Sequence, residues 1–540
     1  MIVPPTPSAS DPVTTAMTGT HTTYDVGPGK PYTPDTMPWD KLQGGDVVNI
    51  YYQATPYLFK FCLAATATQS APVVVNGVTD ASGHRPVFNF SGAKTASACK
   101  NVFNTASAYS LEPFGGIVVG PVLNNVTHKA SFITIKNLEL HGAANGNTFT
   151  TLANGSGSYS DSGAIWIQLG SDITVENNII SDNAFGVFVM TKDSSTAEMC
   201  ERITLRNNRI FGNGAVGSYL DHNVYMQSTN PIVEGNFFGQ LRMGALGSSY
   251  KSRSSGETFR YNYVQASARA VDWVQSEDSN PGITTQPDYG TDYAYGNVFV
   301  NDQNLPLGAA TNPIHYGGDN CGEQSITVGS ISATTAATSV ASTIASTCHG
   351  EIYRQHLYFY NNTVINNTSA YASVVELSLD SGQVDAWNNI FYFSGGGQFA
   401  LLDSVGKMNL RGTNLIFGTH GYTLDKTHLA VTSPGSATGM GLITVMGTVL
   451  SSSPAFLNVA TGDFDIGSTS GAIDMAGGTP TGTQAVVALS GTLIGAAMPF
   501  APSIAYMQDP VSAEPRVDSN GAAARTITGA AMDLGAMEAQ

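Results

Sequence analysis

Charged residues are scarce in this 540-residue sequence. Only 12% of its residues are charged, against about 25% in typical soluble domains. The 23 basic and 40 acidic residues include no run of lysine or arginine, so no nucleic-acid partner is expected, because phosphate neutralisation needs a basic footprint. Exposed helix faces need glutamate, lysine and arginine, and a chain poor in these residues favours strands and turns.

Cysteine is also scarce. The five cysteines form no CxxC pair, so zinc and redox motifs of that kind are not indicated. Cys62 with Cys99, and Cys321 with Cys348, would each close a modest loop. Two disulfides formed in an oxidising compartment, or buried free thiols, are both open at this point. Cys200 is left over in either case.

No stretch of the chain is continuously apolar over a membrane-spanning length. Residues 1–25 lack the basic start and apolar core of a signal peptide. We expect them to be a disordered or extended leader, or the start of a mature chain whose signal has been removed. The most apolar late segment, 485–507, is interrupted by serine, glycine, threonine and proline, which predicts buried strand and not a membrane span.

What the sequence does contain is an internal repeat. Several short segments alternate apolar residues, place an asparagine after them and continue with a further apolar pair. These segments are ITVENNII (173–180), ITLRNNRI (203–210), PIVEGNFF (231–238), TFRYNYV (258–264), YAYGNVFV (293–300), LYFYNNTVI (357–365) and VDAWNNIFY (384–392). ITIKNLEL (133–140) has the same pattern, with Leu138 at the asparagine position.

The last asparagines of these segments recur at similar intervals. From Asn178 to Asn389 the successive separations are 30, 28, 26, 35, 65 and 27 residues. Such a period, with several short strands per repeat, predicts an all-β fold, the right-handed parallel β-helix, in which stacked coils bury one core. The interval of 65 allows two coils, or one coil with 317–350 inserted. Two to four ordinary domains also suit the length, whereas antiparallel hairpins would need Asn-Gly turns, which are sparse.

The recurring asparagine lies where a strand gives way to a tight turn. Asparagine tolerates the left-handed conformation that such a bend needs, and its amide can bond to the asparagine one coil away. The open ends of a β-helix must be covered. We therefore expect a leader at 1–25, an N-terminal cap with the first coils at 26–110, a central β-helix at 111–400 with an insert near 317–350, and last coils with a C-terminal cover at 401–540.

Several segments carry a family resemblance. They are YDVGPGKPYTPDTMPWDKLQGGDVVNIYYQATPY (24–57), APVVVNGVTDASGHRPVF (71–88), HNVYM (222–226), KSR (251–253), SSPAFLNVATGDFDIGSTSGAIDMAGG (452–478) and DLGAMEA (533–539). With them the chain resembles, over nearly its whole length, bacterial right-handed parallel β-helix proteins of the pectate-lyase-like superfamily. The resemblance implies carbohydrate chemistry, which in that superfamily includes lyases, hydrolases, esterases, epimerases and non-catalytic surface proteins.

Counting back from the ladder asparagines finds a pair of reactive side chains. Tyr225 lies 11 residues before Asn236, and Lys251 lies 11 residues before Asn262. Equivalent positions on adjacent coils are about 4.8 Å apart, so we expect Tyr225 and Lys251 to be neighbours.

Other reactive side chains surround this pair. His222 is three residues before Tyr225, and Arg253 is two residues after Lys251, so it shares the face of Lys251. The next coil offers Arg269, Asp272 and Trp273. This is the densest cluster of reactive side chains in a chain with few charges.

The chemistry that fits these residue types is β-elimination at a uronic acid. A cation neutralises the carboxylate beside the α-carbon, and a base removes the proton that this neutralisation acidifies. Lys251 and Arg253 could supply neutraliser and base, while Tyr225 or His222 could donate to the leaving oxygen. The KSR segment resembles the lysine-bearing strand of lyases that cleave dermatan sulfate and alginate. The arginine that those enzymes carry one coil later has no aligned counterpart, since Arg269 is shifted.

Each of these residues also has a structural alternative. Lys251 and Arg253 could be a solvated pair on an outer face, and Asp272 could only orient them. His222 could cap a loop. Trp273 could be a sugar-stacking platform, or a core or rim aromatic.

Other reactions find less support. A polygalacturonase-like hydrolase needs adjacent aspartates, and the chain has no Asp-Asp dipeptide, although inverting hydrolysis by Asp221 and Asp272 stays compatible. Neither the motif of a pectin methylesterase nor a phosphate loop, GxSxG elbow or HExxH is found. Ca²⁺ would need converging carboxylates, for which Glu277, Asp278 and Asp288 are candidates, so the cofactor stays open.

The sequence therefore predicts a secreted or cell-surface protein that acts on, or binds, a polysaccharide. A lyase is the leading mechanism. The alternative is a non-catalytic surface, adhesin or structural assembly protein, which the Ser/Thr/Gly-rich, weakly charged composition suits. A long β-helix could also form a homo-oligomer or a polymer.

Overall fold

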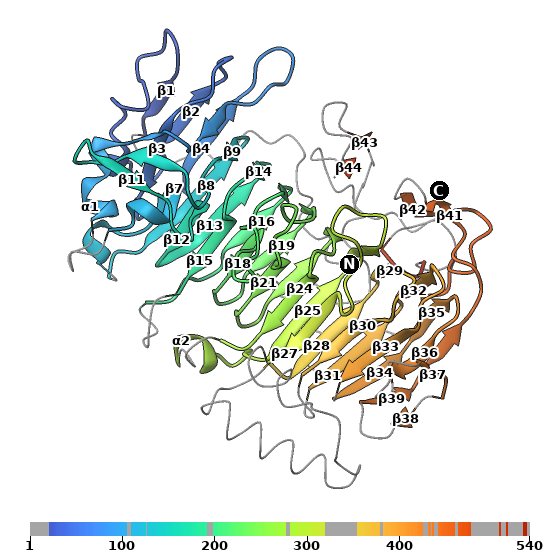
Figure 1. Ribbon diagram of the computed structural model, residues 1–540. Coiled ribbons are helices and arrows are strands. Elements are labelled where there is room, and N and C mark those ends of the chain that lie inside the picture. Colours follow the sequence, from blue (N-terminus) through green and yellow to red (C-terminus); the bar gives the residue numbers. More distant parts are fainter. Residues whose placement is uncertain are drawn as a thin grey trace. The chain divides into compact units, whose positions relative to one another are not determined.

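The chain folds into two compact units. We call residues 11–254 with 280–286 the N-terminal unit, and residues 255–279 and 287–540 with 1–10 the C-terminal unit. The positions of the two units relative to one another are not determined (Figure 1). The computed structural model describes residues 21–104, 110–125, 127–191, 198–276, 281–318, 354–378, 382–404, 406–424, 430–433, 435–436, 441–459, 463–476, 507–508, 515–516 and 533–536.

The N-terminal unit stacks its strands into three sheets (Figure 1). Sheet A contains β1 (Thr23–Val26), β2 (Val47–Tyr51), β4 (Val73–Val78), β8 (Ala130–Lys136), β13 (Gly170–Glu176), β16 (Thr204–Arg206) and β19 (Ile232–Glu234). Sheet B contains β5 (Val87–Asn89), β9 (Glu139–His141), β14 (Ile179–Ser181), β17 (Arg209–Phe211) and β20 (Phe237–Phe238). Sheet C contains β3 (Phe59–Leu63), β7 (Gly115–Val119), β12 (Gly163–Gln168), β15 (Phe185–Met190), β18 (Val224–Met226) and β21 (Ser248–Ser252), with β6 (Lys94–Thr95), β10 (Thr148–Thr150) and β11 (Ser156–Ser158) at its edge.

The C-terminal unit repeats this arrangement. Sheet A contains β22 (Thr258–Arg260), β25 (Thr291–Tyr295), β28 (His356–Tyr360), β31 (Gln383–Trp387), β34 (Lys407–Arg411), β39 (Leu442–Val445) and β38 (Gly435–Ser436). Sheet B contains β23 (Tyr263–Gln265), β26 (Val298–Asp302), β29 (Thr363–Asn367), β32 (Ile390–Ser394), β35 (Thr413–Phe417) and β40 (Thr448–Leu450). Sheet C contains β24 (Arg269–Val274), β27 (Ile314–Gly317), β30 (Ala372–Leu377), β33 (Phe399–Ser404), β36 (Gly421–Leu424) and β37 (Ala430–Val431).

Helices are short wherever the structure describes the chain. They are η1 (Trp39–Lys41), η2 (Ser97–Cys99), α1 (Lys100–Phe103), η3 (Glu112–Phe114), η4 (Val122–Asn124) and α2 (Pro281–Thr284). Within those described ranges, none is long and apolar enough to cross a membrane. Two small hairpins complete the elements: β41 (Phe456–Asn458) with β42 (Asp463–Ile466), and β43 (Met507–Gln508) with β44 (Pro515–Arg516).

Successive coils pair in parallel, as the repeat predicts. In β8 and β13, Ile133 pairs with Ile173 and Ile135 with Val175, and all four side chains are fully buried. Residues between them on each strand face outward, because side chains alternate across a strand. Each coil therefore covers the inward side chains of the next coil, and the parallel β-helix is confirmed over the antiparallel alternative.

The asparagine ladder exists in both units. In the N-terminal unit, Asn178 Nδ2 donates to Asn208 Oδ1 at 3.2 Å, and Asn208 Nδ2 donates to Asn236 Oδ1 at 3.0 Å. In the C-terminal unit the same bonds join Asn262, Asn297, Asn362, Asn389 and Asn414. The ladder thus reaches Asn414, one coil further than the repeat found in the sequence, which ends at Asn389.

The left-handed residue at the bend is not the ladder asparagine itself, as we expected, but the residue before it. Asn177, Asn207 and Asn361 have φ values of 52°, 56° and 52°. Glycine holds this position where the sequence reads Gly-Asn, at Gly235 and Gly296. The bend therefore falls one residue before the ladder asparagine. The ladder asparagine itself is buried, and its amide bonds to the asparagine of the next coil.

The interval of 65 residues is one coil with an insert. Asn297 Nδ2 donates directly to Asn362 Oδ1 at 2.9 Å, and β26 pairs with β29 without a strand between them. The extra residues enter after β27, and 319–353 lie outside the described residues.

Of the two cysteine pairs for which a disulfide or free thiols stayed open, one forms a disulfide. Cys62 in β3 and Cys99 in η2 are bonded, with their Cα atoms 5.6 Å apart. Cys321 and Cys348 lie outside the described residues, as does most of the leader 1–25, although β1 already begins at Thr23. Cys200 is a buried thiol.

A charged cluster on the outer face of sheet A fastens the later coils of the C-terminal unit. Asp385 Oδ1 accepts hydrogen bonds from Asn409 at 2.7 Å and from Arg411 at 3.0 Å, and its other oxygen lies 3.1 Å from His356 Nε2. Burial raises the pKa of the Asp385 carboxyl, but these partners outweigh it and lower the pKa from 3.8 to about 2.

Removing one rung of the ladder should destabilise the N-terminal unit. Asn208 accepts from the Asn178 backbone amide at 3.0 Å and donates to the Val175 carbonyl at 2.8 Å. Asn208→Ala leaves both buried groups unpaired, at about 1–3 kcal/mol each, so the urea unfolding midpoint should fall clearly. Asn304→Ala, which removes an exposed amide bonded to Asp302, is the control and should leave the midpoint unchanged. Equal midpoints for the two variants would contradict the role of the ladder.

The Asp385 cluster should make stability depend on pH. The folded-state pKa is depressed, so the ionised carboxylate stabilises the fold above about pH 4, and this contribution disappears as pH falls through about 2. Asp385→Asn should therefore lower the free energy of unfolding by about 2 kcal/mol at neutral pH, and this difference should shrink towards pH 2. Chemical denaturation of both proteins across this range is the measurement, and a difference that stays constant with pH would rule out the carboxylate.

Candidate functional site

An outward column on sheet C of the N-terminal unit contains two of the predicted site residues. The strand register aligns Trp166, Phe188, Tyr225 and Lys251 on β12, β15, β18 and β21. Trp166 and Phe188 stack with ring centroids 4.2 Å apart, and Phe188 and Tyr225 stack at 4.8 Å. Tyr225 and Lys251 are direct cross-strand partners, which confirms that they are neighbours on adjacent coils.

The predicted residues of this unit are covered side chains. Lys251 is 8% exposed, Arg253 4%, Tyr225 9% and His222 2%. Arg253 follows Lys251 by two residues, just beyond the end of β21 at Ser252. Lys251 is thus held beside an aromatic column in a region largely shielded from water, where electrostatic interactions are stronger than at an open surface.

His222 makes a hydrogen bond of the kind expected for a loop-capping residue. Its Nδ1 accepts from the backbone amide of Ser248 at 2.9 Å. A neutral ring with Nδ1 as acceptor carries its proton on Nε2, which is then a donor. Next to it, burial raises the pKa of the Asp221 carboxyl, and the nearby Asp161 adds to this shift against a hydrogen bond from Ser218.

Arg269, Asp272 and Trp273 belong to the C-terminal unit, so the structure does not join them to Lys251 in one described site. Trp273 packs in the core at 1% exposure, and its Nε1 donates to Glu257 Oε1 at 3.0 Å. Asp272 lies on the opposite face of β24. Arg269 contacts it at 3.5 Å between Nη1 and Oδ1.

Sheet C of the C-terminal unit has a second outward column, which the spacing in the sequence did not predict. Register aligns Asp272, His315, Glu376 and Asp403 on β24, β27, β30 and β33. Arg269 Nη2 lies 3.3 Å from Glu376 Oε2, so it bridges two carboxylates of this column.

The sequence distance from each residue of this column to its ladder asparagine decides whether the sequence could have predicted it. Asp403 lies 11 residues before Asn414, the same offset that identified Tyr225 and Lys251. Asp272 and His315 lie 25 and 47 residues before their ladder asparagines, because the chain between strand and ladder is longer there. A constant offset therefore cannot detect them.

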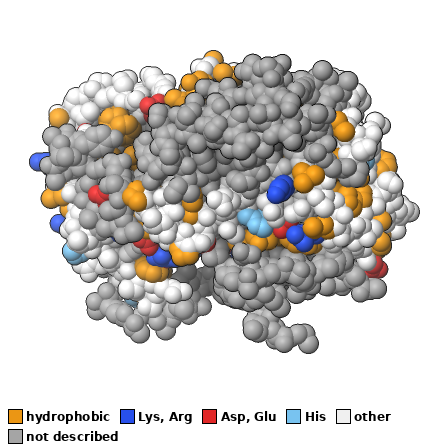
Figure 2. Space-filling model, turned by 90° about the horizontal axis from the view of Figure 1, so that it is seen from below, with side chains coloured by type: hydrophobic (Ala, Val, Ile, Leu, Met, Phe, Trp, Pro, Cys, Tyr) orange, Lys and Arg blue, Asp and Glu red, His pale blue; other side chains and the backbone are white. Residues whose placement is uncertain are grey.

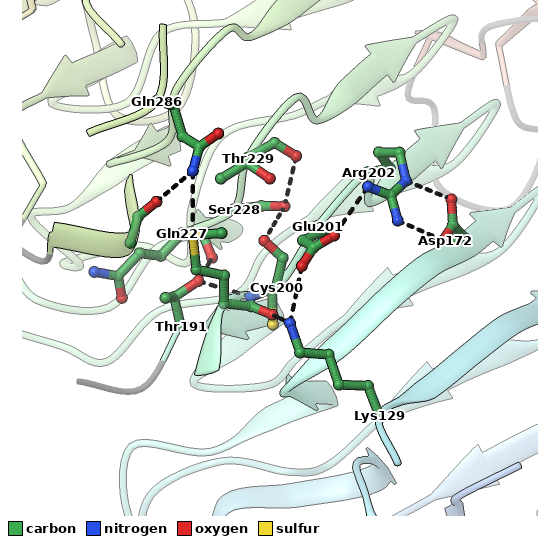
Figure 3. A network of polar contacts seen from close by, with 12 residues as sticks. Lys129, Asp172, Thr191, Cys200, Glu201, Arg202, Gln227, Ser228, Thr229 and Gln286 are labelled. Atoms are coloured by element: carbon green, nitrogen blue, oxygen red, sulfur yellow. Dashed lines mark hydrogen bonds and ion pairs between the residues drawn. The ribbon is translucent and has the colours of Figure 1, made fainter. Parts of the chain in front are cut away.

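A network of ion pairs joins turns of the N-terminal unit (Figure 3). Arg202 binds Asp172 through two hydrogen bonds of 2.7 and 2.8 Å, and Lys129 Nζ donates to Glu201 Oε1 at 2.9 Å. Burial raises the pKa of the neighbouring Cys200 thiol to about 11, so it stays protonated at neutral pH and is a poor nucleophile. The network is suited to fastening coils and carries no reactive group of its own.

Metal-binding groups do not converge in the part of the chain that the structure describes. No group of three or more histidine, cysteine, aspartate or glutamate side chains there could hold an ion. Of the calcium candidates, Glu277 and Asp278 lie outside the described residues, and burial raises the pKa of the Asp288 carboxyl. On the face shown in Figure 2, the few charged side chains, some with red and blue side by side, lie among hydrophobic and uncharged ones.

Comparison with known proteins agrees with the fold. The family model described as a right-handed beta helix region matches residues 91–280. No curated protein sequence matches the chain.

Three solved structures illustrate the likeness. Pectate lyase Pel9A is 12% identical with a TM-score of 0.42, over 99% of this chain and 100% of that one. An alginate lyase from Paenibacillus sp. str. FPU-7 is 10% identical with a TM-score of 0.28, over 80% and 99%. A GH136 lacto-N-biosidase from Eubacterium ramulus is 11% identical with a TM-score of 0.35, over 80% and 68%. By its strand pairing and the family-model match, the chain is a right-handed parallel β-helix protein, as its resemblance to the pectate-lyase-like superfamily implied.

Proposed function

We propose that this protein acts on a polysaccharide containing uronic acids and cleaves it by β-elimination. The observation that carries the proposal is the direct pairing of Tyr225 with Lys251 on the outer face of sheet C. Arg253 brings a second cation two residues further along the chain. A base, a carboxylate neutraliser and a hydroxyl donor are the three groups that this reaction needs.

Each side chain has a defined task in this reaction. Arg253, which stays charged, neutralises the uronate carboxylate and so acidifies the proton on the adjacent carbon. Lys251 removes that proton, and Tyr225 donates its hydroxyl proton to the departing glycosidic oxygen. The bond to that oxygen breaks and a carbon–carbon double bond forms, so no water is consumed.

The aromatic residues beside Tyr225 support a sugar ligand. Trp166 and Phe188 continue the column along the stack. Aromatic rings combine large apolar surface with defined geometry and offer contact area for the C–H faces of sugar rings. A chain of sugars running along the stack would meet these rings before it reaches Lys251.

We also propose that the protein works outside the cell, in secreted or surface-bound form. The Cys62–Cys99 disulfide supports this location, because such bonds persist in oxidising compartments.

A non-catalytic glycan-binding or surface assembly protein, alone or as a homo-oligomer, is the second candidate. The observation that favours it is the burial of Lys251, Arg253, Tyr225 and His222, all below 10% exposure. Side chains covered to this degree would serve to hold coils together and not to meet a polymer.

Ultraviolet absorbance of the unsaturated uronate product tests the lyase proposal. The purified full-length chain should produce this signal on at least one polymer from a panel of uronate polysaccharides. Lys251→Ala should reduce the rate by about 10²–10⁴-fold, the usual contribution of a general base.

Lys136→Ala is the matched control, because Lys136 is an outward lysine on sheet A of the same unit. It should keep the wild-type rate. If the folded wild-type chain gives no signal on any uronate polymer, the lyase proposal is wrong, and retained binding to the same polymers would favour the second candidate.

A further inference from the structure

A serine, a histidine and a carboxylate form a hydrogen-bonded chain on sheet C of the C-terminal unit. Asp272 and His315 are cross-strand partners on β24 and β27, with Oδ1 and Nδ1 2.6 Å apart. His315 Nε2 lies 2.6 Å from Oγ of Ser378, which directly follows β30. Asp272 and His315 therefore lie on two consecutive strands of one sheet, and Ser378 lies at the end of the next strand (Figure 1).

The direction of these hydrogen bonds follows from the groups themselves. An ionised carboxylate only accepts, so Nδ1 of His315 carries the proton that it donates to Asp272. Nε2 of the neutral ring is then an acceptor, and the Ser378 hydroxyl must donate to it. A hydroxyl that donates to an imidazole oriented by a carboxylate is the arrangement that makes serine a nucleophile.

Two glycines bring a further donor to the serine. The backbone amide of Gly318 donates to Ser378 Oγ at 3.0 Å. Gly317 has φ +131°, and a Cβ there would lie 3.0 Å from Ser378 Oγ and 3.3 Å from its amide nitrogen. Glycine at 317 thus leaves room for the Ser378 side chain to reach His315, which lies on the same strand as Gly317, and the Gly318 amide fixes the position of Oγ.

A purely structural role fits these residue types poorly. Elsewhere this chain ties its coils together with uncharged asparagine amides, as in the bond between Asn262 and Asn297, and the aspartate–histidine pair of Asp385 and His356 leaves its imidazole 24% exposed, whereas His315 is fully buried. A buried carboxylate and imidazole cost more desolvation than an amide does, and Asp272 needs Arg269 beside it as a counter-charge. Cross-linking coils does not require groups that can move a proton.

The geometry points to a second activity for this protein, the hydrolysis of a small acyl ester on a hydroxyl-rich compound, with Ser378 as the nucleophile. The serine Oγ bonds to the ester carbonyl carbon while its proton passes to His315 Nε2. The bond to the alkoxy oxygen then breaks, and that oxygen takes the proton and leaves as an alcohol. Water attacks the acyl-serine, His315 takes its proton and returns it to Oγ, and a carboxylic acid is released.

The surroundings of Ser378 define the substrate class. Because Ser378 and His315 are at most 1% exposed, a substrate must reach them with its acyl group alone, which limits that group to a small one such as acetyl. Glu376 lies two residues before Ser378 on the same face, and its Oε2 accepts a hydrogen bond from Asn312 at 3.1 Å. Arg269, with a side chain 19% exposed, bridges Glu376 and Asp272. These polar groups suit the hydroxyls of an acylated sugar.

The test uses the full-length chain with a small fluorophosphonate and with para-nitrophenyl acetate. The wild-type protein should gain the mass of one phosphonyl group, which peptide mapping should place on Ser378, and should release nitrophenol. Ser378→Ala should lose labelling and reduce hydrolysis by about 10³-fold or more.

Ser373→Ala is the matched control. Ser373 is a buried serine on β30 whose hydroxyl donates to Asn312 at 2.9 Å, and its loss should leave labelling unchanged. Asp272→Asn tests the positioning residue: labelling should slow markedly while the melting temperature stays near that of the Ser373 variant.

Labelling at another residue, or none on the folded wild-type chain, overturns the proposal, because a serine that a small phosphonate cannot reach cannot take an ester. The Lys251→Ala variant should label normally. The outcome is therefore independent of the lyase assay.

Discussion

The need to satisfy every backbone and side-chain polar group between stacked coils governs this structure. Parallel strands pair with the coil before and after, but the bends between sheets leave backbone groups without strand partners. The ladder asparagines provide these partners. Asn208 accepts from the amide of Asn178 and donates to the carbonyl of Val175, so one side chain joins its own coil to the preceding coil. Where the ladder position holds Leu138, its own amide still donates to Asn178 Oδ1 at 2.9 Å, so the backbone part of the pattern survives without the side chain.

Because residues in the core and at the bends are needed for packing and for hydrogen bonds between coils, reactive side chains can only lie at outward positions. On sheet C, register sets which residues meet, and spacing between strands of about 4.8 Å keeps them within reach. The N-terminal unit uses this face for stacked rings that end at Lys251, whereas the C-terminal unit uses it for Asp272, His315 and Glu376. The same scaffold thus presents cations and aromatic rings in one unit and proton-transfer groups in the other.

The sequence was sufficient to predict the coils, because the asparagines that fix the bends are visible at each repeat. It also predicted the pairing of Tyr225 with Lys251, since each of them lies 11 residues before its ladder asparagine. It could not predict that Asp272 meets His315. Residues inserted between a sheet C strand and the next ladder asparagine change the sequence separation of the two but not the strand register. The residue that faces Asp272 can therefore be identified only from the hydrogen-bonded strands. The left-handed position was misplaced by one residue for a related reason: neighbouring asparagines look alike in sequence, while only the buried one can bridge coils.

The contrast between amides and ionisable groups bears on how the two outer columns should be understood. An amide ladder is insensitive to pH, costs little desolvation and repeats at every coil, as expected of a structural device. The bonded Asp272, His315 and Ser378 side chains come from two strands and the end of a third, require glycine at 317 and need Arg269 for charge balance. Features that demand local exceptions of this kind are retained by function more readily than by stability, because an asparagine would join the coils at lower cost. A weaker form of the same argument applies to the residues proposed for β-elimination, since burying the Lys251 side chain is also a costly way to join two coils.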